Sequence, residues 1–179
     1  MITRRNSISE KLVIVTPIYE DTKSAKKLLN ELKNLFQENI FIVAVDDGSI
    51  QEPFRIEILN RLSIEGVVVK LVKNVGHQKA IAIGLQYVAD KLDWVKKIVV
   101  MDSDGEDDPE TVPILLEILE KDDIDVAVGK RKNRSENRMF KIFYGIYQII
   151  FKILTGRSFG FGNFISFKAG ALKRIVAMP

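Results

Sequence analysis

Two aspartates separated by one residue follow an apolar run and form the strongest chemical pattern in the chain. The run Lys97–Met101 reads KIVVM and leads directly into Asp102-Ser103-Asp104. Side chains two residues apart in an extended segment point to the same side, so both carboxylates can face one cation. Hard carboxylate oxygens suit Mg²⁺ or Mn²⁺, which completes its coordination shell with water and phosphate oxygens. The pattern predicts a metal site at Asp102 and Asp104 that could hold a diphosphate.

The acidic stretch DSDGEDDPE allows two other interpretations. A calcium-binding loop that begins at Asp102 is excluded, because such a loop needs glycine at its sixth position and glutamate at its twelfth, where this chain has Asp107 and Pro113. An acidic loop that stabilises the start of the following helix remains open. We assign that role to Asp107 and Asp108, and metal binding to Asp102 and Asp104.

Two further polar clusters follow apolar runs. Asp46-Asp47-Gly48-Ser49 predicts a tight turn whose carboxylates can accept hydrogen bonds from a base N–H or a ribose hydroxyl. Asn74–Lys79 opens a helix whose first N–H groups, together with Lys79, could approach a phosphate. His77, the only histidine in the chain, lies in this segment. A single histidine is more often a surface or capping residue than a catalyst, and we do not assign it to catalysis.

The elements that must position these clusters alternate along the chain. Apolar runs predict strands at Leu12–Thr16, Ile40–Val45, Val67–Val72, Lys97–Met101 and Ile124–Val128. Apolar residues at helical spacing, or a proline in the first turn, predict helices at Lys23–Phe36, Pro53–Leu62, Gly76–Ala89 and Pro109–Leu119.

Strands this apolar, with helices between them, predict an α/β fold in which a mostly parallel, Rossmann-like sheet carries helices on both faces. Ligands of such sheets bind outside the carboxyl ends of the strands. The polar clusters fall at those ends, beginning with Pro17-Ile18-Tyr19-Glu20 after the first strand and ending with Gly129-Lys130-Arg131 after the fifth. The sequence therefore predicts one ligand site at this edge.

Composition excludes several classes of protein. With no cysteine among 179 residues, disulfides, zinc–thiolate sites and a thiol nucleophile are impossible. The N-terminal residues lack a signal-peptide core, and no run of about 18 apolar residues occurs, so we expect a cytoplasmic protein without a clear membrane span.

The net charge of +3 hides an asymmetry. Residues 1–128 carry 16 Lys+Arg against 23 Asp+Glu, a net of −7, whereas residues 129–179 carry 11 against one, a net of +10. We divide the chain into an extension (1–10), an α/β ligand-binding domain (11–130) and a basic, apolar segment (131–179). The last segment is expected to meet an anionic partner such as phosphate or the inner face of the cell membrane, although a solvated basic face is the simpler alternative.

Within the basic segment, Arg138–Arg157 predicts a helix with one narrow polar stripe and an apolar remainder. One interpretation is a helix that lies in the membrane interface. The other is a helix packed against the sheet, against further residues or against a second copy of the chain. The sequence leaves both open.

In order and spacing, these features resemble the family 2 glycosyltransferases, which have the GT-A fold, over about residues 11–168. The resemblance implies an inverting enzyme that moves a sugar from a UDP- or GDP-sugar, with Mg²⁺ or Mn²⁺ held by Asp102 and Asp104. It also implies that Asp47 contacts the base of the nucleotide. The full set of nucleotide-contacting residues that it implies is Pro17, Tyr19, Glu20, Asp46, Asp47, Lys79, Asp102 and Ser103.

The continuation Asp108-Pro109-Glu110, and Gly129-x-Arg131 with Arg134, resemble the branch that contains dolichol-phosphate mannosyltransferase and undecaprenyl-phosphate glucosyltransferases. That resemblance implies a polyprenyl-phosphate acceptor, with Arg131 and Arg134 near its phosphate. No feature indicates nucleic-acid binding.

The chain departs from that branch at Asn163, where the family commonly has an aspartate that acts as base or phosphate organiser. An amide cannot take a proton, so the catalytic base is left unassigned. Because the family continues beyond Met178-Pro179, we also expect this chain to be part of a longer protein.

Two other functions compete with a transferase. A nucleotidyltransferase would be expected to have a glycine-rich basic loop after its first strand, where this chain has Pro17–Glu20. A non-catalytic nucleotide-sugar-binding or scaffolding domain is harder to exclude, because Asn163 replaces the family aspartate.

Overall fold

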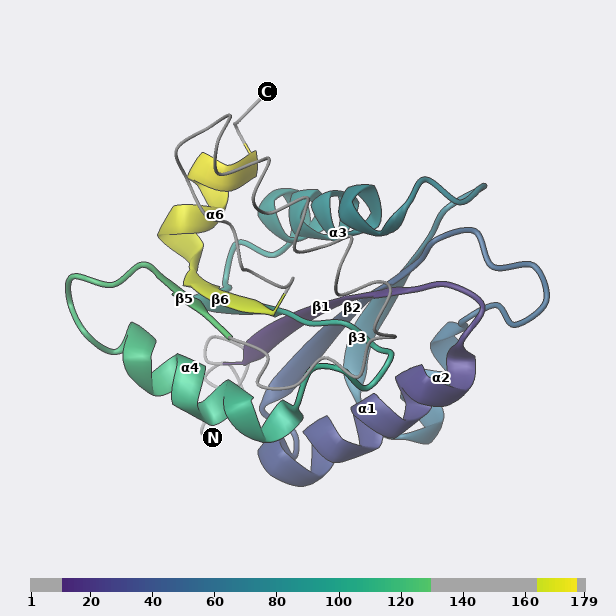
Figure 1. Ribbon diagram of the computed structural model, residues 1–179, viewed down its shortest axis with the longest axis horizontal. Coiled ribbons are helices and arrows are strands. Elements are labelled where there is room, and N and C mark those ends of the chain that lie inside the picture. Colours follow the sequence, from purple (N-terminus) through teal and green to yellow (C-terminus); the bar gives the residue numbers. More distant parts are fainter. Residues whose placement is uncertain (1–10, 130–163, 177–179) are drawn as a thin grey trace, which may run out of the picture.

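The computed structural model describes residues 11–129 and 164–176, which form a six-stranded sheet with helices on both faces (Figure 1). The strands are β1 (Leu12–Ile18), β2 (Ile40–Asp46), β3 (Glu65–Lys70), β4 (Lys97–Val100), β5 (Val126–Val128) and β6 (Ile165–Lys168). The helices are α1 (Thr22–Phe36), α2 (Ile56–Arg61), α3 (His77–Lys91), the short 3-10 helix η1 (Pro109–Thr111), α4 (Val112–Leu119) and α6 (Ala169–Val176).

The strands lie in the order β3-β2-β1-β4-β6-β5. Strands β1 to β4 are parallel, and β6 runs antiparallel to both β4 and β5. After β3 the chain crosses back over the sheet through α3 and adds β4 on the other side of β1. The order therefore reverses between β1 and β4, and in open α/β sheets such a switch point is where ligands bind. The predicted α/β, mostly parallel fold is confirmed.

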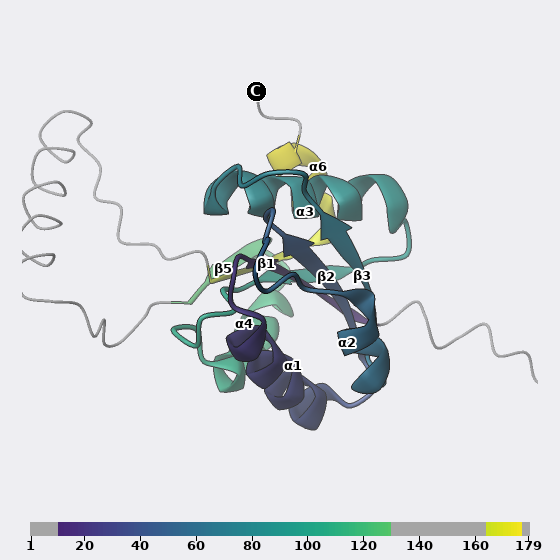
Figure 2. The same cartoon turned by 90° about the vertical axis from the view of Figure 1, so that its right-hand side faces the viewer.

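Helices cover the sheet on both sides and explain why its central strands are apolar on both faces. Figures 1 and 2 show α1, α2 and α4 on one face and α3 and α6 on the other. Ile14 and Ile42 belong to the core on the α1 side, whereas Val13, Val15 and Val43 belong to the core on the α3 side. All five side chains are fully buried, so the pleat alternates between two cores.

Gly84 allows α3 to lie close to the sheet. A Cβ atom at this position would lie 2.6 Å from Cγ1 of Val15 and 2.9 Å from Cγ2 of Val45. Because those neighbours are branched side chains in a packed core, even an alanine here would force a shift. The glycine therefore fixes the height of α3 above β1 and β2, and with it the position of the residues that open the helix.

The structure differs from the sequence-based elements mainly at one side of the sheet. The strand predicted at Ile124–Val128 shortens to β5, an edge strand with Val126 and Val128 exposed. The helix predicted at Pro109–Leu119 begins as η1 and becomes α-helical at Val112. Strand β6 was not predicted, although it lies between β4 and β5.

Strand β6 and helix α6 also bear on the division of the chain. The sequence placed residues 165–176 in the basic segment, yet β6 pairs with β4 over Lys97–Val100, and Ala171 and Leu172 of α6 are buried in the α3-side core. These residues are part of the sheet domain. No helix in 11–129 or 164–176 is long and apolar enough to cross a membrane. The helix predicted at Arg138–Arg157 lies outside the described residues.

Candidate functional site at the carboxyl edge of the sheet

The predicted ligand residues gather where β1, β2 and β4 end. In the parallel pairing of β1 with β2, Ile18 at the end of β1 lies opposite Asp46 at the end of β2. The hydroxyl of Ser103, just after β4, donates a hydrogen bond of 3.1 Å to the carbonyl oxygen of Pro17 in β1. This contact lies at the switch point between β1 and β4, so the structure brings the Asp102–Asp104 segment to the place where the fold favours a ligand.

The backbone of the Asp102–Asp104 segment is held by a buried carboxylate. Oδ2 of Asp107, which is almost fully buried, accepts a hydrogen bond of 2.8 Å from the N–H of Asp102. The sequence did not predict this bond, and stabilisation of the next helix by Asp107 stays a prediction. Asp108 does stabilise the start of that helix, because its Oδ1 accepts from the N–H of Glu110 and caps η1. Only a loop that folds back on itself can bring Asp107 to Asp102, and the sequence carries no separate signal for it.

The two aspartates of the segment differ in exposure. The Asp102 side chain is 9% exposed, and its Oδ1 lies 2.9 Å from Nε2 of His77. Asp104 is exposed, and its Oδ1 accepts a hydrogen bond of 2.9 Å from the N–H of Glu106. Gly105, with φ +86°, turns the backbone between Asp104 and Glu106.

The donor set fits a hard divalent cation that also binds a ligand. Among the described residues, no group of three His, Cys, Asp or Glu side chains forms a ready-made metal cage. Mg²⁺ and Mn²⁺ do not need one, because one or two carboxylates suffice when waters and phosphate oxygens complete the shell. Asp102 and Asp104 supply such carboxylates, and their shared metal stays a prediction.

Asp46 and Asp47 are both buried, which the sequence did not predict for a turn. Asp46 accepts hydrogen bonds from the N–H groups of Ser49 and Phe54, so its carboxylate holds the turn that it begins. Asp47 accepts from Val75 at 2.8 Å and from Gly76 at 3.1 Å. The second aspartate therefore ties the loop after β2 to the loop after β3.

Gly48 makes that close approach of two loops possible. It has φ +75°, and a Cβ atom there would lie 2.4 Å from the carbonyl carbon of Lys73 and 2.6 Å from the backbone nitrogen of Asn74. Both the conformation and the space exclude a side chain. The Asp46–Ser49 turn therefore packs against the loop after β3, and it is also a candidate ligand contact.

Glu20 organises the loop that follows the second strand. Its carboxylate accepts hydrogen bonds from the N–H groups of Ile50, Gln51 and Glu52, at 2.6 to 3.2 Å, and its own N–H donates to the hydroxyl of Ser49. The N–H of Ile50 and then that of Glu52 lower the pKa of this carboxyl below its ordinary value of 4.5. Tyr19, one residue earlier, has 53% of its surface exposed at the same edge.

Replacing Glu20 by glutamine is expected to loosen residues 50–52. The lowered pKa means that the native loop favours the ionised carboxylate, so its contribution is present above pH 4.5 and is lost as the pH falls through the lowered value. The protection factors of the Ile50–Glu52 amides, which correct for the effect of pH on intrinsic hydrogen exchange, should therefore fall in the variant at neutral pH, and in the unmutated chain only in acid. Glu57→Gln, at the start of α2, is the control. Unchanged exchange in Glu20→Gln would show that the carboxylate does not hold the loop.

The remaining predicted residues are not brought into these contacts. Lys79 is exposed on the first turn of α3. Arg131, Arg134 and Asn163 lie outside the described residues, so their roles stay predictions. The contact between His77 and Asp102 was not predicted. The signal was present in the fold class, since a helix that connects two parallel strands begins at the carboxyl edge.

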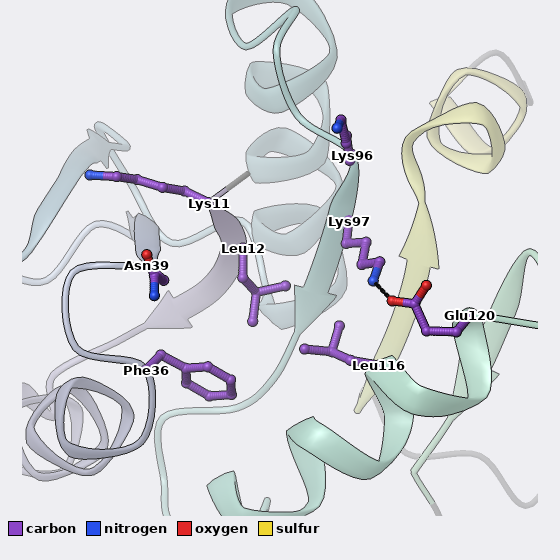
Figure 3. Close-up of a pocket in the computed structure, with 8 residues that line it drawn as sticks. All are labelled: Lys11, Leu12, Phe36, Asn39, Lys96, Lys97, Leu116 and Glu120. Carbon is purple, nitrogen blue, oxygen red and sulfur yellow. Dashed lines mark hydrogen bonds and ion pairs between the residues drawn. The ribbon is translucent and has the colours of Figure 1, made fainter. Parts of the chain in front are cut away.

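A separate pocket lies at the opposite edge of the sheet (Figure 3). Its volume is about 490 Å³, and it is lined by residues before or at the start of β1, β2 and β4 and by α4: Lys11, Leu12, Phe36, Asn39, Lys96, Lys97, Leu116 and Glu120. Lys11 pairs with Glu65 at 2.6 Å, and Lys97 pairs with Glu120. Because it lies at the amino ends of the strands, away from the predicted residues, we do not take this pocket as the site.

Two solved structures share the fold. A mannosyltransferase of Pyrobaculum calidifontis, in complex with GDP-Man and Mn²⁺, superposes with a TM-score of 0.57 at 16% identity, covering 94% of this chain and 47% of the other. Glucosyl-3-phosphoglycerate synthase of Mycobacterium tuberculosis, in complex with Mn²⁺, UDP and glucosyl-3-phosphoglycerate, superposes with a TM-score of 0.60 at 15% identity, covering 89% and 57%. At these identities the likeness shows the fold alone, which is GT-A.

Sequence comparison agrees with the fold. The undecaprenyl-phosphate 4-deoxy-4-formamido-L-arabinose transferase of Photorhabdus laumondii is 31% identical over 157 residues, which cover 84% of this chain and 46% of that protein. The chain thus spans about half the length of that relative. The family described as Glycosyl transferase family 2 matches residues 13–175, which include β1 to β6 and the Asp102–Asp104 segment. On this match, and on the GT-A fold, the chain belongs to glycosyl transferase family 2.

Proposed function

We propose that this chain is the donor-binding part of a metal-dependent, inverting glycosyltransferase that moves a sugar from a UDP- or GDP-sugar to a polyprenyl phosphate. The observation that carries the proposal is the Asp102-Ser103-Asp104 segment at the switch point of the sheet, fixed to β1 through Ser103 and to its own loop through Asp107. The solved structures named above hold GDP-Man or UDP together with Mn²⁺ on the same fold, which supports this assignment.

Each residue has a role in the proposal. Asp102 and Asp104 hold Mg²⁺ or Mn²⁺, which neutralises charge on the departing diphosphate. The nucleoside lies against Asp47 and the loops that it ties together. Further contacts come from residues at the same edge or outside the described ranges, namely Pro17, Tyr19, Glu20, Asp46, Lys79 and Ser103 for the nucleotide, and Arg131 and Arg134 for phosphate or acceptor.

A phosphate acceptor explains why Asn163 does not exclude catalysis. An alcohol must lose a proton to attack an anomeric carbon, which calls for a base. A phosphate monoester with its second pKa near 6 is already mostly ionised at neutral pH. Such an acceptor needs charge neutralisation rather than a base. The Photorhabdus laumondii relative, whose name includes undecaprenyl phosphate, supports an acceptor of this class.

The charge of residues 129–179, a net of +10, supports an acceptor that lies in a membrane surface. Lysine and arginine near an anionic leaflet each contribute about 1 kcal/mol of attraction. We propose that the protein works in the cytoplasm, at the inner face of the cell membrane.

The proposal is tested by supplying sugar donors and a polyprenyl phosphate together. A panel of UDP- and GDP-sugars with Mn²⁺ should contain a donor that raises the unfolding temperature, because a ligand that binds the native state stabilises it by mass action. That donor should then transfer its sugar to polyprenyl phosphate in anionic vesicles. Binding without any turnover would favour a scaffolding domain, and stabilisation by no donor would contradict the proposal.

A further inference from the structure

The start of α3 and the segment that follows β4 meet through His77 and Asp102. Nε2 of the imidazole lies 2.9 Å from Oδ1 of the carboxylate, with 42% of the His77 side chain and 9% of the Asp102 side chain exposed. The distance lies in the range of a hydrogen bond or an ion pair.

The position of His77 is fixed from two sides. Asp47 accepts hydrogen bonds from the N–H groups of Val75 and Gly76, the two residues before His77. Gly84, two turns further along α3, seats the helix directly on Val15 and Val45. The backbone of His77 is therefore held at the carboxyl edge by the Asp47 hydrogen bonds on one side and by helix packing on the other.

The backbone of Asp102 is fixed as well. Its N–H is bound to Oδ2 of Asp107, and the next residue, Ser103, bonds the carbonyl of Pro17. These bonds fix the backbone of Asp102 and do not themselves set the rotation of its side chain. The contact of His77 with Oδ1 restricts the rotation of the Asp102 side chain.

We propose that His77 is a positioning residue, which holds the Asp102 carboxylate in the orientation that binds the metal. Carboxylates that bind metals are themselves commonly hydrogen-bonded, and loss of such a partner typically weakens metal binding 10- to 100-fold. The proposal also assigns Asp47 a second effect. By fixing Val75 and Gly76, it places His77 and so connects the nucleoside side of the site to the metal side.

The inference rests on the proposed function, since the orientation of Asp102 matters only if that residue binds the metal. The test is the Mn²⁺ concentration that gives half-maximal binding of UDP and, separately, of GDP. His77→Phe keeps a planar ring but removes the N–H group, and should raise this concentration about 10- to 100-fold. His77→Gln restores a donor and should recover part of the loss. Gln86→Ala, which removes an exposed side chain from the same helix, should change nothing.

The outcomes separate the inference from the function on which it rests. Nucleotide binding by the unmutated chain that needs no Mn²⁺ would overturn the proposed function. Mn²⁺-dependent binding that Asp102→Asn removes but His77→Phe leaves intact would overturn the positioning role alone. So would equal losses in His77→Phe and His77→Gln, because only packing would then matter. Circular dichroism without metal should show every variant folded at the temperature used.

Discussion

A chain with Asp102→Asn and Asp104→Asn is expected to bind UDP or GDP equally well with Mn²⁺ and with excess chelator. In the proposed site of the unmutated chain, both carboxylates face the diphosphate, and each such pair of charges at about 4 Å is repelled by roughly 1–4 kcal/mol when no cation lies between them. Amides remove both the repulsion and the metal ligands. Calorimetric titration of the nucleotide in Mn²⁺ and in chelator measures the difference directly.

Asp108→Asn is the matched control for the double variant. It changes a carboxylate in the same acidic stretch, but one that caps η1. This control should keep the full dependence on Mn²⁺. A double variant that still binds nucleotide more tightly with Mn²⁺ would contradict the assignment of these two aspartates.

Asp47→Ala should lower both the free energy of unfolding and the affinity for nucleotide. Its carboxylate is buried and accepts from Val75 and Gly76, so the alanine leaves two partly buried N–H groups without that acceptor. An unsatisfied buried donor costs about 1–3 kcal/mol, and the loss of a charged hydrogen bond to the ligand costs a similar amount. The sequence alone predicted only the second effect, because it placed Asp47 at an exposed turn.

Urea denaturation and nucleotide titration separate the two effects of Asp47→Ala. The titration is run at a temperature where the variant is folded. Asp93→Ala, at an exposed position before β4, should leave both quantities unchanged. Lower stability with unchanged affinity would mean that Asp47 only ties the loops together, and its assignment to the nucleoside would be wrong.

The sequence predicted the parallel part of the fold well, because apolar runs such as Leu12–Ile18 and Ile40–Asp46 are buried on both faces. It did not predict β6. That strand, Ile165–Lys168, is four residues long and gains its stability by pairing with β4, which lies far away in the chain. A short strand that lies between two others has too few residues for its own sequence pattern to predict it.

The candidate site likewise has features that the sequence predicted and features that it did not. The positions of Asp102 and Asp104 follow from the strand that precedes them, so their location at the carboxyl edge was predictable. The bond from Asp102 to Asp107 and the contact with His77 depend on how a loop folds back and on where α3 is seated. The fold class places the start of α3 at the same edge as Asp102, but residue types and spacing do not encode the two contacts themselves.

The central claim is that the Asp102–Asp104 segment binds a nucleoside diphosphate through a divalent cation. Titration of the unmutated chain with UDP and with GDP, in Mn²⁺ and in excess chelator, tests this most directly. We predict that at least one nucleotide binds with Mn²⁺ and that chelation weakens its binding at least tenfold, or about 1.4 kcal/mol. Equal affinity in the two conditions would contradict the claim.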